Sequence, residues 1–173
     1  MVNRLVRLVA PMCAALLAVA GCAADREGPP GTFTLVVADS FPTSHPFSKD
    51  GARFLIDRAG ELSGGRLRFE YYPSQQLGAP QDFVNLARSG AVDVAMISPG
   101  YVAAQLPLSG VADLPAMSTE PCRAALALEP LLTDGGILHE ADFAPDGLHP
   151  LVVGVVTGYE VMSGGGRAVT EPA

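Results

Sequence analysis

Residues 32–42 read TFTLVVADSFP, and this stretch decides how the rest of the chain is interpreted. Its first seven residues are a short apolar run rich in β-forming side chains, which predicts a strand over Thr32–Ala38 that ends at Asp39. The segment Ser48–Leu62 then carries apolar residues at helical spacing until a glycine pair stops the pattern. A strand followed by a helix is the basic unit of an α/β fold.

The same alternation continues along the chain. Leu67–Tyr72 is a second strand pattern closed by Pro73, and Pro80–Ser89 has the spacing of a helix. Val92–Ile97 is nearly all apolar, as expected for a strand that helices cover on both faces. Because parallel strands need crossovers of this kind, the sequence predicts an α/β lobe with a mostly parallel sheet flanked by helices.

Three further elements are predicted in the second half. A longer helix is expected near Thr119–Leu132, where Ser118 or the first residue itself would cap the start. Pro130 would bend or end this helix at the preceding residue. Ile137–Phe143 predicts a short helix, and Leu151–Thr157 predicts a fourth strand.

Composition and charge exclude several classes of protein. The chain has 173 residues, 49% of them hydrophobic, and 11 Lys and Arg against 18 Asp and Glu, which is typical of one globular domain. The net charge of −7 offers no basic surface to nucleic acid. Cys122 has no second cysteine nearby in the sequence, so we expect a buried small side chain and not a redox nucleophile.

No pattern with distinctive spacing indicates catalysis, a metal or a phosphate. The sequence has no Gly-x-Ser-x-Gly elbow and no zinc-protease motif, so we expect no enzyme activity and no cofactor. His139, Glu140, Asp142 and His149 match no dedicated metal site and predict a solvated helix end that holds no metal. Ser163–Gly166 lacks the Lys-Ser/Thr of a phosphate loop and predicts a flexible turn.

The N-terminus is expected to be an export signal. Two arginines precede a thirteen-residue apolar run, Leu8–Ala20, which is too short to span a membrane. Residues 17–22 read LAVAGC and look like a bacterial lipobox, so residues 1–21 are interpreted as a lipoprotein signal peptide and Cys22 as the lipidated residue. The alternative is an ordinary cysteine near a signal-peptide cleavage site. Residues 22–31 hold the lipidated cysteine and a Pro/Gly-rich flexible tether.

Ligands of open α/β sheets bind outside the carboxyl ends of the strands. The informative residues are therefore those that follow each predicted strand, and four loops are expected to converge at one edge. These loops are Phe41–His45, Pro73–Gly78, Ser98–Tyr101 and Gly158–Glu160.

At these loops the sequence resembles the extracytoplasmic solute-binding proteins of tripartite ATP-independent periplasmic (TRAP) transporters, the DctP-like group. The resemblance lies in the order and spacing of several short motifs. They are Ala38-Asp39-Ser40-Phe41-Pro42, Ser63-Gly64-Gly65-Arg66-Leu67, Glu70-Tyr71-Tyr72-Pro73, Gln76-Leu77-Gly78 and Asp113-Leu114-Pro115.

The resemblance implies a periplasmic-binding-protein-like fold of type II, in which two lobes close over the ligand. Residues 32–173 would be the N-terminal lobe, with the second lobe largely absent. A protein of this group captures a small organic acid and delivers it to a membrane permease. It would act outside the cytoplasm, in the periplasm or at the outer face of the membrane, held by its lipid.

Seven residues of the four loops are candidate ligand contacts, because their side chains offer hydrogen-bond donors or an aromatic face at the expected edge. They are His45, Gln75, Gln76, Ser98, Tyr101, Tyr159 and Glu160. The alternative for His45 is that it only shapes the turn before Pro46, and for the glutamines that they only solvate a loop. Glu160 would repel an anion unless it points away.

Two other functions stay open at this point. One is a stand-alone lipoprotein that uses the exposed face of the lobe to bind a protein, or a non-functional remnant. The other is an exported hydrolase that depends on Ser98 or His45, although the sequence shows no evident catalytic triad.

Overall fold

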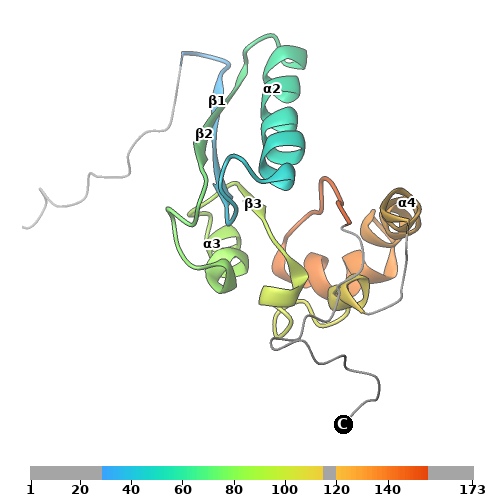
Figure 1. The fold of residues 1–173 in the computed structure, drawn as a ribbon. Helices are drawn as coiled ribbons and strands as arrows, with labels where there is room; N and C mark the ends of the chain where they lie inside the picture. The colour runs from blue at the N-terminus through green and yellow to red at the C-terminus, as the bar shows by residue number, and fades with distance from the viewer. Residues whose placement is uncertain (1–28, 115–119, 156–173) are drawn as a thin grey trace, which may run out of the picture.

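The computed structural model describes residues 29–114 and 120–155, and within them a three-stranded parallel sheet is the centre of the fold (Figure 1). The strands are β1 (Phe33–Asp39), β2 (Leu67–Tyr72) and β3 (Val94–Met96), in the order β2-β1-β3. The predicted α/β lobe with a parallel sheet is therefore confirmed.

The register of the sheet brings the three carboxyl ends to one edge. Where β1 pairs with β2, Phe33 of β1 is opposite Leu67 and Ala38 of β1 is opposite Tyr72. Along β3, the last residue of β1, Asp39, is opposite Met96. Because all three strands are parallel, the loops that follow them begin side by side.

Helices cover both faces of β1. A π-helix, η2 (Phe47–Ala52), continues directly into α2 (Arg53–Leu62), and a 3₁₀ turn, η3 (Pro80–Asp82), leads into α3 (Phe83–Arg88). Successive side chains of a strand point to opposite faces. Val36 and Ala38 pack with Phe83 on the α3 face, whereas Asp39 binds Ser48 of η2 on the other face.

A second apolar cluster joins the sheet unit to the rest of the described chain. Val84 of α3, Val102 and Leu106 are buried together, with Phe143 and Leu148 packed against them. An ion pair of 3.2 Å between Arg88 and Asp146 supports the same junction. The short helices η4 to η7 lie beyond the carboxyl end of β3, and α4 lies farther from the sheet, away from α3 (Figure 1).

Five further helical elements follow β3. The 3₁₀ helices are η4 (Pro99–Tyr101), η5 (Ser109–Asp113) and η7 (Ala144–Asp146), the longest helix is α4 (Pro121–Leu132), and η6 (His139–Phe143) is a π-helix.

The acidic residue Asp142 of η6 organises the start of η5. Its Oδ2 accepts hydrogen bonds from the backbone N–H of Ser109 at 2.7 Å, the hydroxyl of Ser109 at 2.7 Å and the N–H of Leu108 at 3.0 Å. Asp142 and His139 are only 3% and 4% exposed. The prediction of a solvated helix end is therefore wrong for His139 and Asp142, because the carboxylate of Asp142 replaces water as the partner of buried donors. Glu140 and His149 are exposed, as predicted.

Helix α4 departs from its predicted limits at both ends. It begins at Pro121 with Glu120 at the N-cap and no capping side chain, while Ser118 lies outside the described residues. The helix does not end before Pro130 but runs on to Leu132, so only the alternative of a bend at this proline stays a prediction. Pro130 stands in the last turn, where its ring removes one hydrogen bond, and Leu126, whose carbonyl loses that bond, is 68% exposed to water.

The predicted fourth strand is not formed over residues 151–155, which have no regular structure. Leu151 and Val152 are each 66% exposed, so this apolar stretch does not pair with the sheet. The third strand is shorter than predicted and starts after Asp93, whose carboxylate accepts the N–H of Val36 at 2.7 Å.

Cys122 is exposed, which overturns the prediction of a buried thiol. It lies in the first turn of α4, a helix without any buried residue. The predictions for the export signal, for Cys22 and for the turn at Ser163–Gly166 lie outside the described residues. Within 29–114 and 120–155, none of the helices combines the length and apolarity that crossing a membrane requires.

Candidate functional site

The buried carboxylate of Asp39 organises the carboxyl edge of the sheet. Asp39 is the last residue of β1 and is 0% exposed. Its Oδ2 accepts the hydroxyl of Ser48 at 2.6 Å and that of Tyr71 at 2.7 Å, and its Oδ1 accepts the N–H of Phe41 at 2.9 Å. These donors satisfy the charge that burial would otherwise penalise.

The phenol of Tyr71 responds to this environment. Burial raises the pKa of Tyr71 to about 12, and its hydrogen bond to Asp39 acts in the same direction. Both causes disfavour a phenolate beside a carboxylate. Tyr71 therefore holds its proton and stays a donor to Asp39 throughout the neutral range.

The loops after β1 and β2 are joined by backbone hydrogen bonds. Ser74 donates its N–H to the carbonyl of Phe41 at 2.9 Å, and Gln75 donates to the carbonyl of Asp39 at 3.1 Å. Ser74 and Gln75 have φ values of 56° and 62°, which side chains other than glycine rarely adopt. The two bonds hold this turn against the first loop, so its shape is fixed by the neighbouring strand.

Two buried polar atoms at this edge have no hydrogen-bond partner in the described part of the chain. One is the hydroxyl of Ser40, whose residue is 6% exposed and directly follows β1. The other is Oδ2 of Asp113, which lies so close to Gly100 that a Cβ there would stand 3.0 Å from it. Buried polar atoms are nearly always bonded, so each orphan calls for a partner.

The predicted ligand residues of the first two loops differ in their surroundings. His45 stacks on Phe41 with ring centroids 4.1 Å apart, and its Nδ1 accepts the N–H of Phe47 at 3.3 Å. The ring is thus held within its own loop. Gln75 and Gln76 are exposed, and the described hydrogen bonds of both residues involve their backbone.

The third loop places Ser98 and Tyr101 in one turn. The N–H of Tyr101 bonds to the carbonyl of Ser98 at 3.0 Å, Ser98 is half-buried and Tyr101 is 51% exposed. The hydroxyl and ring of Tyr101 are therefore open to a ligand. The two residues predicted in the fourth loop, Tyr159 and Glu160, lie outside the described residues.

Sequence reasoning did not name Asp39 and Ser40 as site residues. The signal that could have found them is the change from an apolar strand to two consecutive polar residues at the expected ligand edge. Their roles depend on partners far away in the sequence, such as Tyr71, 32 positions from Asp39.

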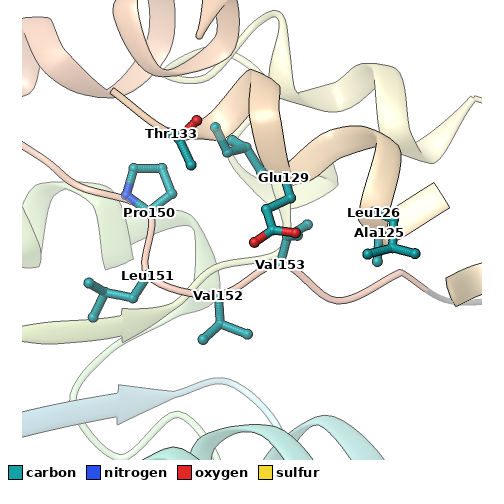
Figure 2. A pocket seen from close by; sticks show the side chains of 9 residues that line it. Ala125, Leu126, Glu129, Thr133, Pro150, Leu151, Val152 and Val153 are labelled. Carbon is teal, nitrogen blue, oxygen red and sulfur yellow. The ribbon is translucent and has the colours of Figure 1, made fainter. Parts of the chain in front are cut away.

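A pocket of about 390 Å³ lies between α4 and residues 150–153, away from the predicted contacts (Figure 2). Its wall is mostly apolar, and none of the five described candidate residues lines it. In Figure 2 the side chain of Glu129 extends from α4 toward Val153. The lining residues are Ala125, Leu126, Glu129, Leu132, Thr133, Pro150, Leu151, Val152 and Val153.

The segment that lines this pocket continues toward the sheet edge. Gly154 lies against the ring of Phe47, where an added Cβ would come within 2.9 Å of Cε1. Phe47 in turn lies beside His45, with ring centroids 5.7 Å apart. The pocket wall and the first loop are thus connected through one tight backbone contact.

Several solved structures with similar folds are TRAP solute-binding proteins. A TRAP solute binding protein from Rhodoferax ferrireducens, solved in complex with copurified benzoate, matches at 29% identity and a TM-score of 0.51 over 57% of this chain and 32% of that one. A TRAP periplasmic solute binding protein from Desulfovibrio salexigens matches at 25% identity and a TM-score of 0.53 over 58% of this chain and 31% of that one.

The parallel sheet and the similarity to these solved structures thus place the fold in the class of solute-binding proteins. Residues 37–166 match the bacterial extracellular solute-binding protein family 7, DctP. This chain belongs to that family, which confirms the resemblance seen in the sequence. The members of the family are extracellular proteins that bind solutes.

A curated relative matches over a shorter stretch. The uncharacterized protein YiiZ of Salmonella typhimurium is 36% identical over 67 residues, which cover 39% of this chain and 20% of that protein. The matched part of the chain spans about a third of the two solved structures and a fifth of this relative.

Proposed function

We propose that this chain is the first lobe of a solute-binding protein that captures a small carboxylate at the carboxyl edge of β2-β1-β3. The observation that carries the proposal is the buried hydroxyl of Ser40, which has no partner within the described residues and stands at the end of the central strand. A carboxylate accepts hydrogen bonds only, so it needs donors of this kind.

The surrounding side chains complete a donor set. Tyr101 offers an exposed hydroxyl and an aromatic face, and Gln75 and Gln76 offer amide N–H groups. Three donors already occupy the oxygens of Asp39, so this carboxylate does not compete for the donors that would bind the solute. In this scheme a second lobe of the kind that the resemblance implies would add charged groups and exclude water when it closes.

The same proposal covers location and partners. Residues 1–21 would direct export, Cys22 would carry the lipid, residues 22–31 would be the tether, and residues 32–173 would form the lobe. The lipid would hold the protein outside the cytoplasm beside a membrane permease that receives the organic acid. The activity is binding and release, not catalysis.

The experiment is a calorimetric titration of the full chain with benzoate and with aliphatic dicarboxylates as probes. We expect a saturable heat that falls on Tyr101→Ala and Gln76→Ala. The matched control is Leu126→Ala, an exposed residue of the pocket wall, which should leave binding unchanged. Binding that fails in wild type, or that fails only on Leu126→Ala, contradicts the proposed site.

One observation favours a second candidate function, a protein-interaction module. Several large apolar side chains are exposed on and around α4. They are Leu126, Leu131, Ile137, Leu151 and Val152. Single exposed apolar residues are common on protein surfaces, whereas a group of them is typical of an interaction site. If the lobe binds another protein through this face, the double variant Leu126→Asp, Val152→Asp should change the association state of the protein in solution.

A further inference from the structure

Two histidines and an aspartate lie close together in the part of the fold that follows α4, apart from the proposed solute site. Asp134 follows α4, His139 begins η6, and His149 follows η7. One ligand atom from each lies within 4.8 Å of the others. The spacing of the three residues in the sequence matches no familiar motif, so only the fold brings them together.

We propose that Asp134, His139 and His149 form a binding site for a divalent first-row transition metal ion, with Zn²⁺ as the reference ion. The ligand atoms are Oδ1 of Asp134, Nε2 of His139 and Nδ1 of His149. Imidazole nitrogens favour zinc and its neighbours over magnesium or calcium, which prefer oxygen ligands.

The distances between these atoms fit one face of a coordination tetrahedron. Nε2 of His139 is 3.2 Å from Nδ1 of His149 and 3.5 Å from Oδ1 of Asp134, and Nδ1 of His149 is 3.4 Å from the same oxygen. Zinc bonds of 2.0 to 2.1 Å place tetrahedral ligands about 3.3 Å apart. The two contacts to Asp134 are longer than the roughly 2.7 to 2.9 Å of a charge-assisted hydrogen bond.

Glu140 supplies the outer contact that such a site uses. Its Oε1 lies 2.9 Å from Nδ1 of His139 and also accepts the N–H of Gly135 at 3.1 Å. A carboxylate only accepts hydrogen bonds, so both contacts place a donor on the Glu140 oxygen. When Nε2 of His139 binds the metal, the ring proton lies on Nδ1, where Oε1 of Glu140 accepts it.

Burial differs among the ligands in a way that suits ion entry. The side chain of His139 is 5% exposed and is fixed by its surroundings, whereas those of Asp134 and His149 are 85% and 66% exposed. The fourth coordination position therefore faces water. A metal can reach the site without opening the fold.

The site shares a wall with the pocket between α4 and residues 150–153. Thr133 and Pro150 line that pocket, and they are the direct neighbours of Asp134 and His149 in the chain. A bound ion would fasten the end of α4 to the start of the 150–153 segment. The metal would therefore stiffen one wall of the pocket.

The test is a titration of the full chain with ZnCl₂, read by competition with a chromogenic chelator. The chain carries no polyhistidine tag and has its three cysteines replaced by serine, so that thiols bind no zinc. We expect one equivalent of Zn²⁺, no competition by Mg²⁺ or Ca²⁺, and visible ligand-field absorption when Co²⁺ is used instead. A chain that binds no Zn²⁺ overturns the proposal.

Variants at the two exposed ligands separate this site from adventitious binding. His149→Ala and Asp134→Asn should each weaken Zn²⁺ binding by more than the roughly 10- to 100-fold expected for Glu140→Gln, which removes only an outer contact. His45→Ala, at the only other histidine of the chain, is the matched control and should bind as wild type does. Unchanged affinity in both ligand variants, or a loss confined to His45→Ala, overturns the proposal.

Discussion

The hydroxyl of Tyr71 donates a 2.7 Å hydrogen bond to Oδ2 of Asp39, and this bond links the ends of two neighbouring strands. Tyr71 lies one residue before the end of β2, and Asp39 is the last residue of β1. Ser48 of η2 donates to the same oxygen at 2.6 Å. One buried carboxylate thus fixes a strand, a helix and the first loop at the edge where we place the solute.

Replacement of this carboxylate should destabilise the fold. In Asp39→Asn one of the two oxygens becomes an amide nitrogen, which donates and cannot accept from Ser48, Tyr71 or Phe41. We expect the free energy of unfolding to fall by about 2 kcal/mol, the range for hydrogen bonds to charged groups. Urea denaturation measures it. Asp57→Asn, on the exposed side of α2, is the control, and an equal effect there would refute the role of Asp39.

The bond between Tyr71 and Asp39 should give stability a dependence on alkaline pH. The pKa of Tyr71 is raised from 10.0 to about 12, so the folded state holds this proton more tightly than the unfolded state. Its contribution is complete below pH 10 and is lost as the pH rises toward 12. In denaturation series over this range, Tyr71→Phe should lose this part of the decline. Tyr72→Phe should keep it, and a decline shared equally by wild type and both variants would contradict the assignment.

The packing between the sheet and α3 should depend on Phe83. This side chain is 1% exposed and belongs to the cluster of Val36, Ala38 and Val92. Phe83→Ala removes a buried ring and leaves a cavity, so we expect a loss of about 3 to 5 kcal/mol in the free energy of unfolding. Phe54→Ala removes the same ring from a position 65% exposed and should cost far less in the same assay.

The hydroxyl of Ser40 should affect stability and binding in opposite directions. Because it has no partner in the described residues, Ser40→Ala should raise the free energy of unfolding by about 1 kcal/mol, the lower range for an unsatisfied polar group. The same variant should bind benzoate about tenfold more weakly if one hydrogen bond is lost. Ser44→Ala, in the same loop but exposed, should change neither quantity. Equal benzoate affinity in wild type and Ser40→Ala would remove Ser40 from the site.

The first three strands could be predicted because each segment has a strand pattern and also finds a partner strand in the sheet. Val36, Val37 and Ala38 of β1 are buried, and Gly64 and Gly65 follow α2 with φ values of 63° and 78°, as the glycine pair indicated. Leu151–Thr157 is a similarly apolar, valine-rich segment, but residues 151–155 find no partner strand in the sheet. A strand pattern states what a segment prefers and not whether a neighbour is available to pair with it.

The candidate site was predictable in its place but not in its chemistry. The rule for parallel sheets located the edge, and Tyr101 is exposed in one of the loops that follow the strands. It could not show that the Asp39 carboxylate would be buried, that His45 would stack on Phe41, or that His139 would meet His149 across ten positions. These relationships depend on register and crossing points that no local pattern contains.

The measurement that tests the central claim most directly is an NMR titration of the isotope-labelled full chain with benzoate, followed at assigned backbone amides. If the carboxyl edge binds the solute, saturable shifts should appear at Ser40, Phe41, Ser74 and Tyr101. Shifts confined to the pocket between α4 and residues 150–153, or no saturable shift at any concentration, would contradict it.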